Sequence, residues 1–430
     1  MSALPAGPRM GRLAGTVSFH RDPLGFLQRC QQDFGDVFTI RLTTVGQVVV
    51  LCDPSSAKAL AKSDPGQASA GEARLGMLPM ASPLSIFGGD GGEHDGARGR
   101  VATAFAPQAI DESGAAIAQL IARHVASWPL GRPTRLLPRM RRLADEVFVR
   151  EVLGVDDPRA GELARAIGRL LWTPGNPPVT IPGPQDGLLG RAVDRAYKRR
   201  RAAIARLIEQ ELEERRARRE AGRGVLGLLI SDEPRRGDEC LVDELLAMLM
   251  AAQEPMAAAL TWLALRLGSA ECDVLRRLQD EGGDGPFAEA VIAETLRLHP
   301  PALAMLRRVE QPVAVAGVEL PPATCTLMPI ALLHRDRRRF SAPEHFKPER
   351  HLDGAEEAAT WPFGLGARSC IGRALAQMQL DSLLKVLLER VVVKPVGPQP
   401  EGMVLRGTIL VPHRSGTVVL AGRPAARGAP

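Results

Sequence analysis

The chain has 430 residues and a formal net charge of +6, and 45% of its residues are hydrophobic. That apolar content is ample for one large buried core, so a single domain can account for a length that would otherwise suggest two or three. The excess positive charge is mostly arginine in short clusters, yet no nucleic-acid motif or set of stacking aromatic residues accompanies it, which argues against DNA or RNA binding. An acidic protein partner is compatible with this charge.

Six cysteines lie far apart in the sequence and form no Cys-x-x-Cys pair, which argues against a disulfide framework and against a structural zinc site. A reducing cytoplasm fits this pattern best. Residues 1–16 contain prolines and charges instead of an apolar run, so the sequence predicts neither a signal peptide nor a membrane anchor. We therefore expect a soluble, cytoplasmic protein.

In chain order, residues 1–18 are expected to form an irregular arm, and a helix over 23–34 precedes a hairpin of 36–42 and 47–52. Apolar residues then recur at helical spacing in 54–62, 113–127, 139–153, 160–172, 188–218, 242–267, 287–299 and 373–389. Two segments rich in Gly and Pro, 66–92 and 173–187, predict long loops. Runs typical of strands occur at 313–320, 324–329, 391–396 and 403–412, and residues 422–430 predict a disordered tail. The pattern indicates a mainly α fold with a smaller β region, in one domain over 1–430.

The segment Trp361–Gly372 is the most informative part of the chain, and Cys370 is its centre. Three glycines within nine residues permit backbone angles that side chains forbid, and they let a flat ligand approach the main chain. The N-terminal end of the following helix favours thiolate over thiol, and a thiolate attracts a cation. Because no second Cys or His stands at zinc-ligand spacing, Cys370 suits a metal whose other ligands belong to a cofactor, as in haem.

Five residues of this segment fill every specified position of Phe-x-x-Gly-x-Arg-x-Cys-x-Gly, and they are Phe363, Gly366, Arg368, Cys370 and Gly372. In these residues the chain resembles the haem-binding signature of the bacterial soluble cytochrome P-450 family. The alternative is a glycine-rich turn with an inert buried cysteine, and five matching positions outweigh it. The resemblance implies the mainly helical P-450 fold, a haem b whose iron takes the Cys370 thiolate as its axial ligand, haem contact at Gly364, and monooxygenase activity in secondary metabolism.

A second resemblance involves Glu294 and Arg297, which stand three residues apart on one helical face, and Arg350 further along the chain. They resemble the family's Glu-x-x-Arg and Pro-Glu-Arg elements, which implies a buried ion-pair network that supports the cysteine loop. For Glu294 and Arg297 taken alone, the alternative is an exposed surface pair. His351 departs from the family, which often has Phe at that position.

The resemblance also implies basic residues for the two haem propionates, because anions in a largely apolar pocket need cations and arginine offers paired donors. His94 and Arg98 match the family's His-x-x-x-Arg helix that lies along the haem. Arg308, in a strand beside the haem, and Arg368, two residues before the cysteine, are the other candidates. A solvated surface position is the alternative for each of these residues.

The predicted helix over 242–267 matches the family's central helix, which crosses the distal face of the haem. Most members have Ala/Gly-Gly-x-Asp/Glu-Thr there, whereas this chain has Ala-Ala-Gln-Glu-Pro at 251–255. Gln253, Glu254 and Pro255 are therefore the candidate catalytic residues, with the acid retained and the proton-delivering hydroxyl lost. Proline also lacks an N–H and clashes with the carbonyl of Ala251, so we expect the helix to kink or open there.

Three functions are compatible with this departure. The first is ordinary monooxygenation, in which the substrate or an ordered water supplies the missing hydroxyl. The second is non-standard haem-thiolate chemistry that depends on peroxide or does not use O₂, such as nitrene transfer, rearrangement or dehydration. Family members that use peroxide place Arg before this proline, whereas Glu254 stands there in this chain. The third is a haem-binding protein without catalysis, against which the retained acid argues weakly.

By position in the resemblance, the substrate pocket draws on two long loops, the central helix, the residues after the Glu294 helix and a late pair of strands. Its candidate residues are Leu75, Met77, Leu78, Met80, Trp172, Met248, Ala252, Met256, Ala302, Leu303, Ala304, Met305, Thr408 and Ile409. This mostly apolar set favours an apolar, medium-sized natural product as substrate, although methionines at helical spacing more often belong to a core.

No FMN or NAD fingerprint occurs in the chain, so the electrons are expected to come from a separate ferredoxin- or flavodoxin-type protein. Arg373 and Arg100 are the candidates for its docking surface.

Overall fold

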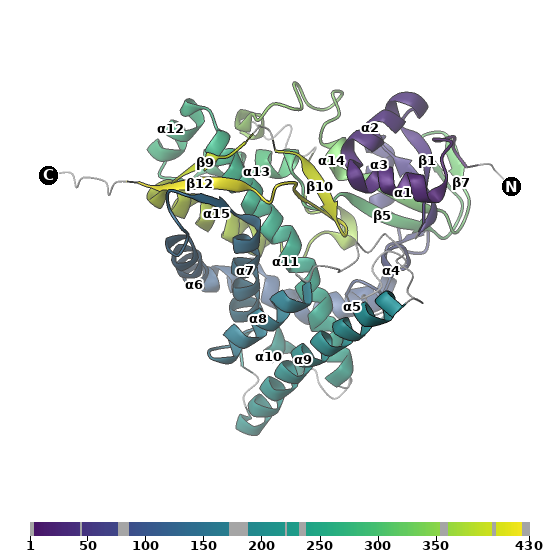
Figure 1. The fold of residues 1–430 in the computed structure, drawn as a ribbon. Helices are drawn as coiled ribbons and strands as arrows, with labels where there is room; N and C mark the ends of the chain where they lie inside the picture. Colours follow the sequence, from purple (N-terminus) through teal and green to yellow (C-terminus); the bar gives the residue numbers. More distant parts are fainter. Residues whose placement is uncertain are drawn as a thin grey trace.

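The computed structural model describes residues 4–43, 45–75, 86–171, 188–219, 222–231, 238–352, 360–397 and 401–423. Helices dominate these residues, and the strands form small sheets, as the sequence predicted (Figure 1). The N-terminal helices and strands lie on one side of the molecule, and the long central helices lie on the other. Within the described residues, no helix has the length and apolar character needed to cross a membrane.

The chain begins with two helices, α1 (Arg12–Arg21) and α2 (Pro23–Phe34). Helix α1 corrects the expectation of an irregular arm over residues 1–18, because residues 12–18 are helical. Asp22 separates the two helices, and its carboxylate accepts a hydrogen bond from the Gly25 N–H at 3.0 Å. The expected hairpin follows as β1 (Val37–Leu42) and β2 (Gly46–Leu51) in antiparallel register.

The main sheet has the strand order β1-β2-β8-β5-β3, and it brings together distant parts of the chain. Its other strands are β3 (Ala68–Ser69), β5 (Ala304–Val309) and β8 (Cys325–Pro329). Strands β2 and β8 run parallel, whereas the remaining pairs are antiparallel. Alternate residues of β2 enter different cores: Val48 and Val50 join the core under α1 and α2, and Val49 and Leu51 join the core with α3 (Pro54–Ala61).

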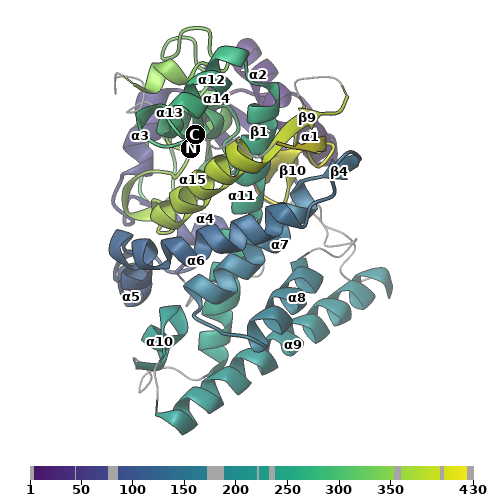
Figure 2. The same ribbon diagram turned by 90° about the vertical axis from the view of Figure 1, so that its left-hand side faces the viewer.

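The helical region surrounds α11 (Asp238–Ser269), which packs against α7, α13 and α15 (Figure 2). Its other helices are α5 (Gly91–Ala102), α6 (Pro107–Ala126), α7 (Leu137–Val147), α8 (Arg159–Leu171), α9 (Leu188–Arg218), α10 (Gly224–Ser231), α12 (Cys272–Asp280), α13 (Pro286–Leu298) and α15 (Arg373–Arg390). Most of these bounds agree with the predicted periodicity, and α9 agrees at both ends. Helix α11 is unbroken through Pro255, so the expected opening is not present.

Short elements complete the fold. Helix α4 (Gly71–Leu75) and strand β3 lie in the segment 66–92 that was expected to be a loop. The strand-like run 313–320 is a small hairpin of β6 (Val313–Val315) and β7 (Val318–Leu320), and α14 (Ile330–Leu333) follows β8. The C-terminal strands are β9 (Val391–Pro395), β10 (Met403–Arg406), β11 (Ile409–Pro412) and β12 (Thr417–Gly422), and β12 pairs with both β9 and β4 (Pro133–Arg135).

Candidate active site

Cys370 lies in a loop that its own backbone hydrogen bonds close just before α15. The Cys370 N–H donates to the Phe363 carbonyl at 2.8 Å, and the Gly364 N–H donates to the Trp361 carbonyl at 3.0 Å. Gly364 has φ +73° and Gly366 has φ +69°, a region that side chains rarely occupy. This backbone presents Cys370, whose side chain is exposed, at the N-terminal end of α15.

The pKa of the Cys370 thiol is subject to opposing effects. Burial among dense protein atoms raises its pKa, although the side chain remains accessible, whereas the Gly372 N–H and the charges of Arg98 and Arg74 lower the pKa. The net direction is upward, so the helix end does not by itself produce the thiolate that the sequence led us to expect. A bound metal ion supplies the positive charge that deprotonates a coordinating thiol.

Two of the predicted basic residues fix the position of the cysteine loop, Arg98 from α5 and Arg368 from within the loop itself. Arg98 of α5 donates to the Ser369 carbonyl at 2.9 Å. Arg368 donates to the carbonyls of Ile86 and Gly89 and forms an ion pair with Asp90 at 2.5 Å. These contacts join the loop to the start of α5.

His94 shares a face of α5 with Arg98, four residues along the helix. Its side chain is buried, with Nδ1 3.1 Å from an Asp95 oxygen. Burial, and to a lesser degree the charge of Arg368, lower the pKa of His94, which favours its neutral form. His94 therefore contributes a hydrogen-bonding group to this face more readily than a charge.

The adjacent arginines of β5 point in different directions. Arg308 donates to both oxygens of Glu310, at 3.2 and 3.1 Å, and about a third of its side chain is exposed. Arg307 is buried, donates to the Ala61 carbonyl, and lies close enough to Arg368 for that charge to lower its pKa, after burial, to about 10. The geometry therefore favours Arg307 over Arg308 as the β5 residue on the cysteine-loop side.

Arg74 of α4 is a further cation that the sequence analysis did not select. Burial, followed by the charges of Arg368 and Arg307, lowers the pKa of Arg74 to about 10, whereas Asp90 and Cys370 oppose that shift. Its guanidinium carbon also lies 5.9 Å from the centre of the Phe87 ring. Arg74 is therefore a neighbour of both the thiol and the other arginines.

These residues fit a haem. Within the described ranges, no group of three or more His, Cys, Asp or Glu side chains could hold a metal ion. A single thiolate suits a metal whose other ligands belong to a cofactor. Arginines gather around the loop, with Asp90 as the carboxylate among them, and they are Arg74, Arg98, Arg307 and Arg368. Such an excess of positive charge suits a cofactor that carries acidic arms.

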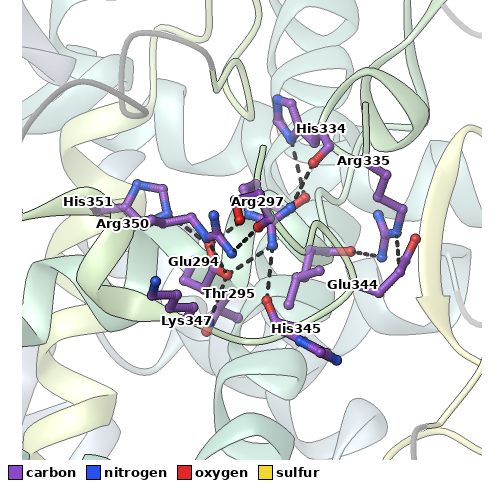
Figure 3. Close-up of polar contacts among 12 residues, drawn as sticks. Glu294, Thr295, Arg297, His334, Arg335, Glu344, His345, Lys347, Arg350 and His351 are labelled. Atoms are coloured by element: carbon purple, nitrogen blue, oxygen red, sulfur yellow. Dashed lines mark hydrogen bonds and ion pairs between the residues drawn. The ribbon is translucent and has the colours of Figure 1, made fainter. Parts of the chain in front are cut away.

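The predicted Glu294 network is present and buried (Figure 3). Arg297 donates to both Glu294 oxygens at 2.7 and 2.9 Å, and Arg350 donates to one of them at 3.1 Å. The Lys347 N–H donates to the same carboxylate at 2.9 Å. His351, which seemed only a departure from the family, has Nε2 2.9 Å from a Glu294 oxygen and is a further member. The side chains of Glu294 and Arg297 are completely buried, which excludes the surface-pair alternative.

The charge of Glu294 depends on these donors. Burial alone would raise the pKa of its carboxyl, but hydrogen bonds from Arg297 and His351, the charge of Arg297 and the Lys347 N–H lower the pKa to about 2. Arg297 also donates to the carbonyls of His334 and His345, at 2.7 and 3.3 Å. The network therefore fastens α13 to the segment that leads to the cysteine loop.

The three candidate catalytic residues of α11 have different surroundings. Gln253 is buried, and neither atom of its amide has a hydrogen-bond partner in the described part of the chain. Glu254 forms a bidentate ion pair with Arg141 of α7, and the Arg141 Nε lies 3.0 Å from one Glu254 oxygen. Pro255 is half-buried and lies four residues from the exposed Ala251, so these two share a face. The three residues therefore do not converge on one point.

The described pocket candidates fall into two groups. Met248 and Met256 are buried in the helical core, and Ala252 packs against that core. Ala302 bridges to Ile409, and the Leu303 N–H donates to the Thr408 carbonyl at 3.4 Å, so the residues after α13 meet the β10–β11 turn. Leu303 and Met305 are buried in the two cores of the main sheet, and Ala304 packs against one of them.

The remaining pocket candidates lie outside the described residues, and they are Met77, Leu78, Met80, Trp172 and the side chain of Leu75.

The two candidate docking arginines differ in availability. Arg373 is exposed at the start of α15, with its guanidinium carbon 5.6 Å from the centre of the Phe363 ring in the cysteine loop. Arg100 instead forms an ion pair with Glu244 of α11, with the nearest atoms 3.7 Å apart. Arg373 therefore remains a candidate for a docking surface, and Arg100 has an internal role.

The comparisons with known proteins indicate a single family. A family model described as Cytochrome P450 matches residues 145–419. A Mycobacterium tuberculosis protein that carries the name cytochrome P450 135B1 is 29% identical over 457 aligned positions, which cover 99% of this chain and 96% of that protein. A Mycobacterium bovis protein named cytochrome P450 138 is 29% identical over 433 positions, which cover 98% and 97%.

The fold also occurs among solved structures. Retinoic acid-bound cyanobacterial CYP120A1 superposes with a TM-score of 0.83 at 22% sequence identity. The match covers 98% of this chain and 100% of that chain. At this level of identity the likeness concerns the fold.

Proposed function

The chain belongs to the cytochrome P450 family of haem-thiolate oxidoreductases, and we propose that it inserts oxygen into an apolar, medium-sized molecule of the natural-product type. The observation that carries this proposal is the accessible Cys370 thiol within a loop that the hydrogen bonds of Arg98 and Arg368 join to α5 and to the residues before it. Cys370 is the proposed axial ligand of haem b, and Arg74, Arg98, Arg307 and Arg368 are the proposed partners of its propionates. When bound, the haem supplies the capacity to activate oxygen.

The protein's own contribution is to orient the substrate and to exclude charged molecules from the pocket. The apolar set around Met248, Ala252 and Met256 supports an apolar substrate, because charged groups would be costly to bury there. The contact of Ala302 and Leu303 with Ile409 and Thr408 adds small and apolar side chains from a second direction. We propose that these two groups of residues face the substrate from different sides. We also propose that the reaction belongs to secondary metabolism and takes place in the cytoplasm.

A separate protein is the proposed source of electrons. The exposed Arg373 lies directly after the cysteine loop, where a cation can attract the acidic surface of a ferredoxin- or flavodoxin-type partner. Replacement of Arg373 with Glu should slow reduction by the partner and weaken its dependence on ionic strength. Arg276 of α12, which is exposed and forms a pair with Asp273, offers a matched control at a different site.

Non-standard haem-thiolate chemistry is the second candidate function, and one observation favours it. Pro255 has no hydroxyl, and both oxygens of Glu254 are already engaged by Arg141. The two groups that would usually manage protons beside the haem are therefore missing or occupied. This supports a reaction that needs less proton delivery, such as nitrene transfer, rearrangement or dehydration.

One series of experiments tests both candidates. Candidate ligands are first identified by the spectral shift that substrates cause in the haem of the purified protein, and the best ligand is then incubated with surrogate redox proteins and isotope-labelled O₂. Labelled product supports monooxygenation, whereas turnover without O₂ or electrons supports the second function. Absence of turnover under either condition, together with a normal spectrum, supports a silent haem-binding protein.

The haem-thiolate assignment has its own test. The reduced carbon monoxide complex should show the red-shifted absorption band of sulfur ligation, and Cys370→Ser should abolish that band. An unaltered spectrum in Cys370→Ser would overturn the assignment of the ligand.

A further inference from the structure

His334 lies between the Glu294 network and the cysteine loop. It is completely buried and follows α14 directly. Its backbone carbonyl accepts a hydrogen bond from Arg297 at 2.7 Å, and Figure 3 shows the two residues together. Its imidazole contacts the backbone of two residues far apart in the sequence, Arg297 and Trp361.

The partners of the imidazole determine its tautomer. Nδ1 lies 3.2 Å from the Arg297 carbonyl oxygen, which can only accept, so Nδ1 carries the proton. Nε2 accepts the Trp361 N–H at 2.7 Å, so it must be unprotonated. Burial and the nearby charges of Arg297, Arg339 and Arg335 lower the pKa of His334 to about 3, although the Arg297 carbonyl opposes this shift. The ring is therefore neutral and uses each nitrogen for one contact.

Trp361 is the first residue of the cysteine loop, and its main chain is held on both sides. Its N–H donates to His334, and its carbonyl accepts the Gly364 N–H at 3.0 Å. Its ring is buried, with the Arg339 guanidinium carbon 4.5 Å from the ring centre. Two residues later, the Phe363 carbonyl accepts the Cys370 N–H. A path of short contacts therefore leads from Arg297 through His334 to the cysteine.

We propose that His334 is a positioning residue for the cysteine loop, which couples the Arg297 backbone to the Trp361 N–H and so sets where Cys370 meets the iron. This role rests on Cys370 as the haem ligand. His334 links the buried network to the loop, because the hydrogen bonds of Glu294 and Arg297 within the described residues do not reach the loop residues directly. Without an acceptor, the Trp361 N–H would be buried and unpaired.

The test uses two substitutions that each preserve one half of the imidazole. His334→Gln can place an amide oxygen near the position of Nε2, so it keeps an acceptor for Trp361. His334→Asn can place an amide nitrogen near the position of Nδ1, so it keeps only the donor to Arg297. His334→Phe removes both contacts. His345→Gln is the matched control, because His345 is exposed in the same segment and bonds to Arg297 through its backbone carbonyl.

Two readouts on the haem-loaded proteins report on positioning. The first is hydrogen exchange of the peptide that contains Trp361, and the second is the fraction of the reduced carbon monoxide complex that shows the red-shifted band. In His334→Asn and His334→Phe we expect Trp361 exchange to accelerate by about 5- to 150-fold, as for a buried donor that loses its acceptor, and the red-shifted fraction to fall. His334→Gln and the control should stay within about twofold of the wild type in exchange.

Equal behaviour of the Gln and Asn variants in both readouts would overturn the proposal, as would unchanged Trp361 exchange in His334→Phe. If the Phe variant does not fold, the comparison of Gln with Asn decides. A wild-type protein without the red-shifted band would contradict the haem-thiolate assignment instead, and the exchange measurement would still judge the contact between His334 and Trp361.

Discussion

The carboxylate of Glu254 on α11 is held by the guanidinium of Arg141 on α7, which donates to both of its oxygens. The two side chains are mostly buried, with 17% and 11% of their surfaces exposed. Burial lowers the pKa of Arg141, and the charge of Glu254 opposes that shift. The residue that was expected to serve chemistry beside the haem therefore also joins two core helices.

Loss of either partner should destabilise the fold. We expect Arg141→Gln and Glu254→Gln each to lower the free energy of unfolding by about 2–3 kcal/mol, between the values typical of exposed and of fully buried pairs. The double variant should cost clearly less than the sum of the two single changes, since they remove the same interaction. Denaturant unfolding measures all three. Arg276→Gln, which breaks an exposed pair with Asp273, should change stability by less than about 1 kcal/mol.

Pro255 can be tested with two replacements that separate its effects. Both Pro255→Ala and Pro255→Thr restore an N–H that can bond the Ala251 carbonyl, so both should raise the thermal unfolding midpoint. Only Pro255→Thr adds a hydroxyl, so it alone should increase the consumption of O₂ in the presence of surrogate redox proteins. If the Thr and Ala variants consume O₂ at the same rate, the missing hydroxyl has no consequence and the proline is a neutral change.

Arg307 and Arg308 form a matched pair on one strand. We expect Arg307→Gln to accelerate transfer of haem to an acceptor protein by about ten- to a hundredfold, as for a lost hydrogen bond to a charged group. Arg308→Gln should change the rate by less than about twofold, because Arg308 is already engaged with Glu310. The opposite order of effects would return the propionate role to Arg308.

Acid should destabilise the protein in two ranges. The pKa of His334 falls from 6.5 to about 3 in the folded protein. As the pH drops below 6.5, the unfolded state therefore binds a proton that the folded state does not bind, and the folded state loses stability. The pKa of Glu294 falls from 4.5 to about 2, so the stability present above pH 4.5 is lost as the pH falls towards 2. Unfolding by denaturant at a series of pH values measures both. The stability difference between the wild type and His334→Gln should shrink below pH 6.5, and a constant difference would contradict the assignment to His334.

Local patterns in the sequence predicted much of the fold and part of the site. The long helix α9 was predicted at both ends from its apolar periodicity, and the spacing of Glu294 and Arg297 placed them on one helical face. Helix α1 was missed because its sequence contains Gly, Thr and Ser without a clear apolar stripe.

Other contacts depend on the tertiary structure. Arg141 and Glu254 are 113 residues apart, and no local signal connects them. The choice between Arg307 and Arg308 depends on which face of β5 each side chain occupies, and a shift by one residue reverses it. His334 is a single histidine between apolar and basic residues, so its two backbone partners become visible only once the chain is folded.

The close approach at Gly366 has a consequence for how the molecule can be shortened. A side-chain carbon at this position would lie 2.9 Å from the carbonyl oxygen of Ala61, the last residue of α3, and Arg307 donates to that same oxygen. The cysteine loop thus packs directly against the N-terminal third of the chain. A fragment that starts after α3 would lose the contact between Gly366 and Ala61. We therefore expect that the helical region does not assemble a stable haem site by itself.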